Sequence, residues 1–306
     1  MSALSGIITP LVTPFCDDGA LDCESLERLV EFQIVSGVHG LFLFGSSGEF
    51  AALTESQRDL ALVTVIRAAA GKAPVLVGVS DNSTVRVIER CRQALDCGAQ
   101  GLVITAPFYH VNSQSEIVDH FSAIHAAVRL PIYAYDVPVL AKAKIEPKTV
   151  KKLASDGVIS GLKDSSGDMS GLRQIIIETA GIEGFSVFTG MELLVDTALL
   201  MGASGAVAGL ANVAPRDYVE LFDACELGDW ERAVSIQTRL TRLFDIVYIG
   251  APGGGYSAGA LSAFKAALVC RGILKTPKMA APMRSLDREG VEKVRQMLQC
   301  LQFSTE

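Results

Sequence analysis

Short apolar runs alternate with longer amphipathic segments along most of the chain. The short runs are rich in branched or aromatic residues, which is typical of parallel strands covered on both faces. The longer segments have helical period; within residues 22–36, for example, Leu26, Leu29 and Val30 fall on one stripe. The alternation predicts eight strands, at residues 6–13, 40–44, 75–79, 101–105, 131–135, 158–163, 185–189 and 205–208.

The order of these elements predicts one large barrel. Helix start signals recur between the strands; Thr54 and Gln57, for example, form a capping box. Eight strand–helix units without a linker favour a (β/α)8 TIM barrel in the α/β class over an open doubly wound sheet, which is the alternative. We place the barrel at residues 1–227 and a C-terminal helical appendix at residues 228–306. Helices of the appendix are expected at residues 230–247, 258–271 and 288–301.

The composition is that of a globular protein without nucleic-acid or membrane partners. Hydrophobic residues make up 49% and charged residues 20% of the 306 positions, which is enough to build a large core. The net charge of −7 disfavours binding to nucleic acid or to an anionic membrane surface. Two uncharged stretches, residues 197–215 and 246–264, are interrupted by Gly, Ser, Asn or Pro and are not expected to cross a bilayer.

Cysteine usage and the N-terminus both favour a cytoplasmic location. The seven cysteines are odd in number, scattered and never spaced as CxxC, so we expect reduced thiols. The first fifteen residues lack the basic region and the continuous apolar stretch of a secretory signal.

In a barrel of this kind the catalytic groups lie at the C-terminal ends of the strands. The sixth predicted strand ends in Lys163, and if Ile159 and Gly161 face the barrel interior, the two-residue alternation makes Lys163 face inward too. Burial favours the neutral, nucleophilic form of an amine. Lys163 is therefore the first candidate for a catalytic residue.

Two further features could act together with this lysine. Tyr133 and Tyr135 share a face of the fifth predicted strand, and a phenol beside an amine can shuttle protons. Residues 45–49 form a small loop of hydroxyls and backbone amides that suits a carboxylate. Each feature alone is more often a solvated lysine, a core tyrosine or a simple turn. Their joint placement indicates Schiff-base chemistry on a 2-oxo acid.

Five short motifs occur in a fixed order along nearly the whole chain. They are Thr-Pro-Phe at 13–15, Gly-Ser-Ser-Gly-Glu at 45–49, Ala-Pro-Phe-Tyr at 106–109, Tyr-Asp-Val-Pro at 135–138 and Gly-Leu-Lys-Asp-Ser-Ser-Gly-Asp at 161–168. With these motifs the sequence resembles the pyruvate-dependent class I aldolases that include N-acetylneuraminate lyase and dihydrodipicolinate synthase. The resemblance implies a covalent imine between pyruvate and Lys163, an aldehyde as second substrate, and neither a metal nor an organic cofactor.

The resemblance also assigns roles to other residues. It implies that Tyr135 is the proton relay and that Ser46 and Ser47 bind the pyruvate carboxylate and pass protons to Tyr135. Tyr109 matches a tyrosine that, in many members, reaches into a neighbouring subunit's site, so a homotetramer built as a dimer of dimers is expected. The implied substrate-binding residues are Ser46, Ser47, Gly48, Leu140, Gly190, Glu192 and Val207.

One position departs from the dihydrodipicolinate synthases. They usually carry an arginine that grips the aldehyde's carboxylate where this chain has Leu140. Loss of that charge-assisted contact weakens selection for an anionic aldehyde by roughly 2 kcal/mol, unless Lys142 or Lys144 replaces it. A 2-keto-3-deoxy sugar acid or a related 4-hydroxy-2-oxo acid is therefore the preferred substrate class. Condensation of pyruvate with aspartate semialdehyde is the alternative.

Glu192 and the segment Gly253–Gly259 each allow two interpretations, of which one involves substrate binding and the other does not. Glu192 matches an acidic, hydroxyl-binding position of the sialic acid lyases, but a carboxylate that satisfies a helix N-terminus explains it equally well. The segment Gly253–Gly259 reads as a substrate-facing loop with Tyr256 in the pocket, or as a connector.

Reactions of other classes fit the sequence less well. Residues 255–259 match the GxSxG elbow of serine hydrolases with Ser257 as nucleophile, yet in that fold the histidine follows the serine. All four histidines precede Ser257. His120 and His125 are five apart in one predicted helix and miss the spacing of a metal-binding pair. A barrel that binds a 2-oxo acid without turning it over would not need both Lys163 and Tyr135.

Overall fold

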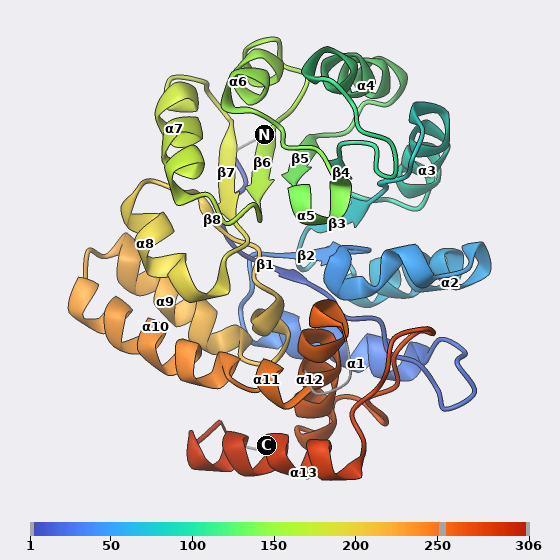
Figure 1. The fold of residues 1–306 in the computed structure, drawn as a ribbon, viewed down its shortest axis with the longest axis vertical. Helices are drawn as coiled ribbons and strands as arrows, with labels where there is room; N and C mark the ends of the chain where they lie inside the picture. The colour runs from blue at the N-terminus through green and yellow to red at the C-terminus, as the bar shows by residue number, and fades with distance from the viewer. Residues whose placement is uncertain (1–2, 251–254, 304–306) are drawn as a thin grey trace.

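The computed structural model describes residues 3–250 and 255–303. Eight parallel strands pair in sequence order, and the last strand pairs with the first, which closes the sheet into a barrel (Figure 1). The predicted TIM barrel is confirmed. The strands are β1 Gly6–Pro10, β2 Gly40–Leu43, β3 Val75–Gly78, β4 Gly101–Thr105, β5 Ile132–Asp136, β6 Gly161–Asp164, β7 Ser186–Thr189 and β8 Gly205–Ala206.

Helices surround the barrel and continue beyond it (Figure 1). Those of the βα units are α1 Cys23–Val35, α2 Glu55–Ala69, α3 Thr84–Asp96, α4 Gln114–Ala127, α5 Pro138–Ala141, α6 Pro147–Ser155, α7 Met169–Thr179, α8 Val195–Leu200 and α9 Pro215–Glu226. The C-terminal helices are α10 Trp230–Phe244, α11 Val247–Gly250, α12 Tyr256–Cys270 and α13 Arg288–Cys300. Short 3-10 turns lie at η1 Ser46–Gly48, η2 Phe50–Ala52, η3 Glu192–Leu194 and η4 Gly209–Asn212.

Local signals account for most of the element boundaries. The capping box at the start of α2 is present, with the Thr54 hydroxyl accepting from the Gln57 amide at 3.2 Å. β1 stops three residues earlier than the sequence pattern predicts, at Pro10. The amide of Val12 donates to the side chain of Asn212 instead of to a neighbouring strand, so the ladder ends there.

The alternation of side chains gives the barrel two distinct apolar layers. Inward-facing residues, among them Tyr133 and Tyr135, form one cluster, and outward-facing residues pack with the helices in a second, larger one. From the sequence, Ile159 is expected to face the barrel interior, but in the structure it packs in the outer cluster. Its amide and that of Val158 both donate to the Leu153 carbonyl at the end of α6, so β6 begins only at Gly161.

Residues 274–287, which we call the C-terminal strap, run from α12 to α13 and pass near the start of the β1–α1 connection (Figure 1). The strap is held on both sides: the Ala280 amide donates to the Glu49 carboxylate and Lys275 pairs with Glu24 of α1, while the Lys278 carbonyl accepts from Lys265 of α12. The strap thus forms part of the rim at the C-terminal mouth.

The sequence also predicts no membrane-spanning segment and reduced cysteines. Within the described ranges, no helix combines the length and the apolar character that a bilayer crossing requires. All seven cysteines are free thiols, as predicted.

Candidate active site

A cavity of about 730 Å³ opens at the C-terminal mouth of the barrel. Its walls combine the ends of β2, β5, β6, β7 and β8 with α12 and the strap. Eight of the residues predicted to take part in catalysis or binding line it: Ser46, Ser47, Tyr135, Leu140, Lys163, Gly190, Glu192 and Val207.

Lys163 projects from β6 into the barrel, as the alternation predicts. Only 7% of the residue is exposed. Its Nζ lies 4.2 Å from the centre of the Tyr135 ring and 5.3 Å from that of Phe42. The amine therefore lies among aromatic faces, and Lys163 forms part of the cavity lining.

Tyr135 faces Lys163 from the neighbouring strand. The two residues are direct partners in the β5–β6 register, so both side chains leave the sheet on the same side at the same height. The Tyr135 hydroxyl lies 3.3 Å from the Ser46 Oγ, which connects the phenol to the loop after β2. The Tyr135 side chain thus contacts the Lys163 amine with its ring and Ser46 with its hydroxyl.

The loop after β2 folds into a single 3-10 turn, η1. Ser46 and Ser47 line the cavity. Gly48 lies behind them: its amide donates to the Gly45 carbonyl at 2.9 Å, and its carbonyl accepts from the Thr13 hydroxyl at 2.6 Å. Gly48 thus supports the loop, and its amide is not turned toward a ligand.

Glu192 lines the cavity at the start of η3. One carboxylate oxygen accepts from the Gly209 amide at 2.9 Å. Burial raises the pKa of Glu192, although backbone amides and the charge of Lys163 oppose the shift. The carboxylate is thus anchored by an amide at the start of η4, a different turn from its own, and it lines the same cavity as Lys163.

Neither Lys142 nor Lys144 stands in for the missing arginine. Lys142 is exposed, and its ammonium donates to the Val139 carbonyl. Lys144 contacts the carboxylates of Asp136 and Asp164. Both ammonium groups are therefore engaged away from the cavity, whereas Leu140 lies in its wall.

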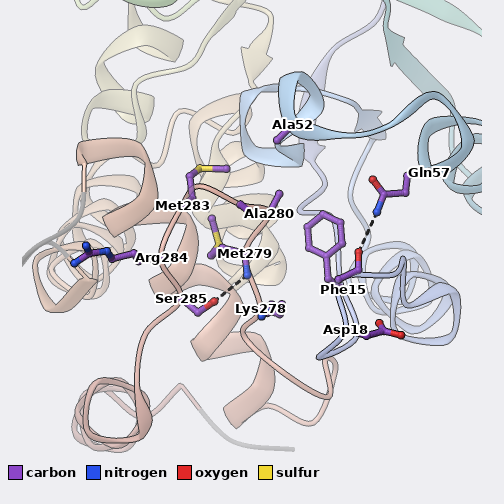
Figure 2. Close-up of a pocket in the computed structure, with 12 residues that line it drawn as sticks. Phe15, Asp18, Ala52, Gln57, Lys278, Met279, Ala280, Met283, Arg284 and Ser285 are labelled. Carbon is purple, nitrogen blue, oxygen red and sulfur yellow. Dashed lines mark hydrogen bonds between the residues drawn. The ribbon is translucent and has the colours of Figure 1, made fainter.

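Several wall residues have no counterpart in the sequence predictions. Arg284 and Met283 reach the cavity from the strap, and Ser165 follows Lys163 by two residues. A second cavity of about 690 Å³ lies on the other side of the strap, where the Met279 amide donates to the Ser285 hydroxyl (Figure 2). Met283 and Arg284 line both cavities, so the strap is the partition between them.

The glycine-rich segment before α12 also reaches the cavity. Gly255, Ser257 and Ala258 line it, which agrees with a substrate-facing loop. Gly253 and Gly254 lie outside the described residues, as does the side chain of Tyr256.

The histidines occupy other parts of the molecule. None of the four lines the cavity that contains Ser257. His39 accepts from the Ile7 amide at the opposite end of β1, and His120 bonds to Thr84. Within the part of the chain that the structure describes, no three histidine, cysteine or acidic residues are grouped as metal ligands.

Tyr109 lies outside the cavity. It is 82% exposed and has a positive φ of 82°, which is uncommon for a residue other than glycine. The side chain is thus held away from its own barrel by the β4–α4 connection.

Comparison with known proteins identifies the family. The model of the dihydrodipicolinate synthetase family matches residues 3–301. An uncharacterized DapA-like lyase of Halobacterium salinarum is 34% identical over 284 residues, which cover 93% of this chain and 90% of that protein. A 4-hydroxy-tetrahydrodipicolinate synthase of Anaeromyxobacter is 31% identical over 299 residues, or 97% of each chain.

Solved structures agree with these relatives. YagE, a prophage protein of the dihydrodipicolinic acid synthase family from E. coli K12 in complex with pyruvate, superimposes with a TM-score of 0.91 at 29% identity and covers 98% of this chain and 99% of its own. Dihydrodipicolinate synthase from Bacteroides thetaiotaomicron gives a TM-score of 0.92 at 33% identity, covering 98% and 100%. The chain therefore belongs to the dihydrodipicolinate synthetase family and is a pyruvate-dependent carbon–carbon lyase.

Proposed function

We propose that this lyase joins or separates pyruvate and an aldehyde through an imine on Lys163, with a 2-keto-3-deoxy sugar acid or related 4-hydroxy-2-oxo acid as substrate. The observation that carries the proposal is the position of the Lys163 amine, 4.2 Å from the ring centre of Tyr135, with both residues in the cavity lining. A nucleophile and a proton carrier then meet where a ketone can enter.

In the cleavage direction, the neutral Lys163 amine attacks the 2-oxo carbon, and the resulting carbinolamine loses water to form the imine. Tyr135 takes the proton of the 4-hydroxyl, the C3–C4 bond breaks, and the aldehyde leaves. The bonding electrons move into the imine to give an enamine. Protonation at C3 and hydrolysis release pyruvate and restore the amine. No metal or organic cofactor is needed, because the iminium nitrogen accepts the electrons.

Ser46 and Ser47 bind the carboxylate of the 2-oxo acid in this scheme. Their hydroxyls lie beside Tyr135 and Glu192 in the same cavity. The contact between Ser46 and Tyr135 then links the residue that binds the substrate carboxylate to the residue that relays protons.

The chemistry of the wall favours a hydroxylated aldehyde. Leu140 offers no charge, and Lys142 and Lys144 point their ammonium groups elsewhere. Glu192 is an acceptor for hydroxyl groups with one oxygen already held by Gly209. On this side of the cavity a hydroxyl group therefore finds an acceptor in Glu192, whereas a second carboxylate finds no cation at Leu140, Lys142 or Lys144.

The alternative is the condensation of pyruvate with aspartate semialdehyde. One observation favours it: Arg284, whose positive charge is the sign that a second carboxylate requires, lines the cavity. The names of several relatives point to the same reaction.

A second copy of the chain is proposed to complete the relay with its own Tyr109. The exposed tyrosine is one support. The other is an apolar cavity of about 420 Å³ beside Ser46, lined by Phe108 and by Thr105, whose buried hydroxyl has no hydrogen-bond partner. Such a site can accept a phenol from a neighbouring subunit in the proposed dimer of dimers.

The test combines trapping with a substrate comparison. Borohydride reduction in the presence of pyruvate is expected to add a pyruvyl group to the peptide that carries Lys163, and Lys163→Ala is expected to abolish the adduct while leaving the melting temperature nearly unchanged. Coupled assays then compare pyruvate release from 2-keto-3-deoxy sugar acids with consumption of aspartate semialdehyde. Absence of an adduct in the wild type would refute the mechanism, and fast turnover of the semialdehyde alone would refute the substrate class.

A further inference from the structure

Lys144 lies between two buried carboxylates at the ends of β5 and β6. Its ammonium contacts Asp136 and lies 3.5 Å from Oδ2 of Asp164. Asp136 is fully buried and Asp164 is 3% exposed. These aspartates directly follow Tyr135 and Lys163, so one cation joins the residues next to both reacting groups.

The strand register explains why the two carboxylates meet. Tyr135 pairs with Lys163 and Asp136 pairs with Asp164 across the β5–β6 ladder. Because side chains alternate between faces, the first pair points into the barrel and the second points outward. The outward pair lies at the last position of the ladder, where only the Ser165 amide, bonded to the Asp136 carbonyl at 2.9 Å, continues the pairing.

The surroundings leave Lys144 as the main partner for the facing oxygens. Oδ1 of Asp136 accepts from the Ile145 amide at 3.0 Å, and Oδ1 of Asp164 accepts from Ser166 through both its amide and its hydroxyl. Among the residues that the structure describes, Oδ2 of Asp164 has no hydrogen-bond partner, and the Lys144 ammonium lies 3.5 Å from it. Without that cation, two buried carboxylates face each other uncompensated.

We infer that Lys144 is a positioning residue for catalysis: by clamping Asp136 to Asp164, it holds the ends of β5 and β6 in register, so that Tyr135 stays opposite Lys163. The inference rests on the proposed function of those two residues. In this role Lys144 does not bind an anionic aldehyde. Its contacts with the two buried aspartates beside the site are then its function.

The charge balance predicts an unusual pH response when the cation is removed. Burial raises the pKa of Asp136, while its hydrogen bond to Lys144 and the Lys144 charge lower it and the neighbouring Asp164 raises it. Burial lowers the pKa of Lys144, but its bond to Asp136 and the charges of Asp164, Asp136 and Asp168 outweigh that effect, so the pKa is raised. Replacement of Lys144 by a neutral residue removes only the influences that keep Asp136 ionised.

In Lys144→Met, Asp136 therefore keeps its proton to a higher pH than in the wild type, and once that proton is lost its carboxylate faces Asp164 without the cation between them. A folded-state pKa above the unfolded value gives stability that is present at low pH and is lost as the pH rises through the folded value. Relative to the wild type, the stability and the kcat of the variant are thus expected to rise as the pH falls toward 6 and to be lowest at pH 8. A lysine that acted only as a surface charge would not produce this direction.

The experiment compares four variants with the wild type at a temperature far below their melting points. Lys144→Met is the test, Lys144→Arg is the conservative rescue, and Lys144→Met combined with Asp136→Asn removes the repulsion. Lys142→Met is the matched control, since Lys142 is an exposed lysine two residues away that bonds only to a backbone carbonyl. Borohydride trapping of pyruvate, kcat, KM and the melting temperature are measured at pH 6 and pH 8.

Lys144→Met is expected to lose on the order of tenfold or more in kcat and in trapping rate at pH 8, with a much smaller loss at pH 6 and little change in KM for pyruvate. The arginine variant and the double variant are expected to recover most of the loss, and Lys142→Met to match the wild type. Equal behaviour of Lys144→Met and Lys142→Met would overturn the inference, as would a double variant no better than the single one. Failure of the wild type to trap pyruvate would instead count against the proposed function, and the melting temperatures at the two pH values would still test the clamp.

Discussion

The Lys265 ammonium contacts the Glu49 carboxylate inside the protein, and both side chains are fully buried. The other oxygen of Glu49 accepts from the Ala280 amide at 2.8 Å, and Lys265 donates to the Lys278 carbonyl at 2.7 Å. Glu49 directly follows the turn that carries Ser46 and Ser47. The ion pair therefore ties the proposed carboxylate-binding loop to the C-terminal strap.

Removal of one partner of this pair is expected to be costly. Lys265→Met leaves a buried carboxylate without its cation, so we expect the free energy of unfolding to fall by about 3–5 kcal/mol. Urea denaturation measures the change. The matched control is Lys275→Met, which breaks the exposed Lys275–Glu24 pair and should change the free energy of unfolding by less than about 1 kcal/mol. If both variants lost a similar amount of unfolding free energy, the buried pair would contribute no more to stability than the exposed pair does.

The two tyrosines of β5 provide a second test because they differ in one respect. Both are buried and face into the barrel, and among the described residues the Tyr135 hydroxyl, unlike that of Tyr133, lies within hydrogen-bond distance of a side chain beside Lys163, the Ser46 Oγ at 3.3 Å. Tyr135→Phe is expected to lower kcat by roughly 10²–10⁴ with a smaller effect on KM, the usual range for a lost general acid or base. Tyr133→Phe should stay within about a factor of ten of the wild type. Steady-state kinetics on the same substrate decide between them, and an equal effect of both changes would argue against a relay through Tyr135.

Sequence patterns located the reacting groups because those groups follow local rules. The two-residue alternation predicted that Tyr135 and Lys163 face the barrel interior, and the βα order brought their strand ends to one mouth. For Lys163 the predicted direction is correct although Ile159, from which the alternation was counted, does not face inward. The ends of the strands were predicted less accurately. Val12 and Ile159 continue the apolar pattern, but their amides bond to a side chain and to a helix carbonyl.

The rest of the site depends on contacts between distant parts of the chain. Arg284 reaches the cavity only because the strap returns across the mouth, and the engagement of Lys144 depends on where two other strands end. One signal was available for Lys265: it is the single charged residue in the apolar helix Tyr256–Cys270, and a charge in such a helix needs a buried partner. The sequence does not say that the partner is Glu49.

The identity of the aldehyde can be tested at Leu140. If an arginine at this place selects for a carboxylate near the aldehyde, then Leu140→Arg should raise kcat/KM for aspartate semialdehyde relative to a sugar-derived aldehyde by about tenfold or more, which is the value of one charge-assisted hydrogen bond. Leu140→Met is the control for bulk and should leave the ratio unchanged. The measurement is the ratio of the two specificity constants. An arginine variant with the wild-type ratio would mean that position 140 does not contact the distal end of the substrate.

His120 predicts how stability depends on pH away from the active site. The ring is 3% exposed between α4 and α3, and its Nδ1 lies 2.9 Å from the Thr84 hydroxyl. Burial lowers its pKa from 6.5 to about 4, so the folded protein holds the ring neutral where the unfolded chain protonates it. The unfolded state therefore binds more protons between pH 6.5 and 4, and the stability contributed by the neutral ring is lost as the pH falls through that window. We expect the free energy of unfolding of the wild type, minus that of His120→Gln, to drop by about 3 kcal/mol from pH 7 to pH 4. His125→Gln, which changes an exposed histidine of the same helix, is measured over the same pH range as the matched control. A flat difference for His120→Gln would show that the buried ring titrates alike in the folded and unfolded chains.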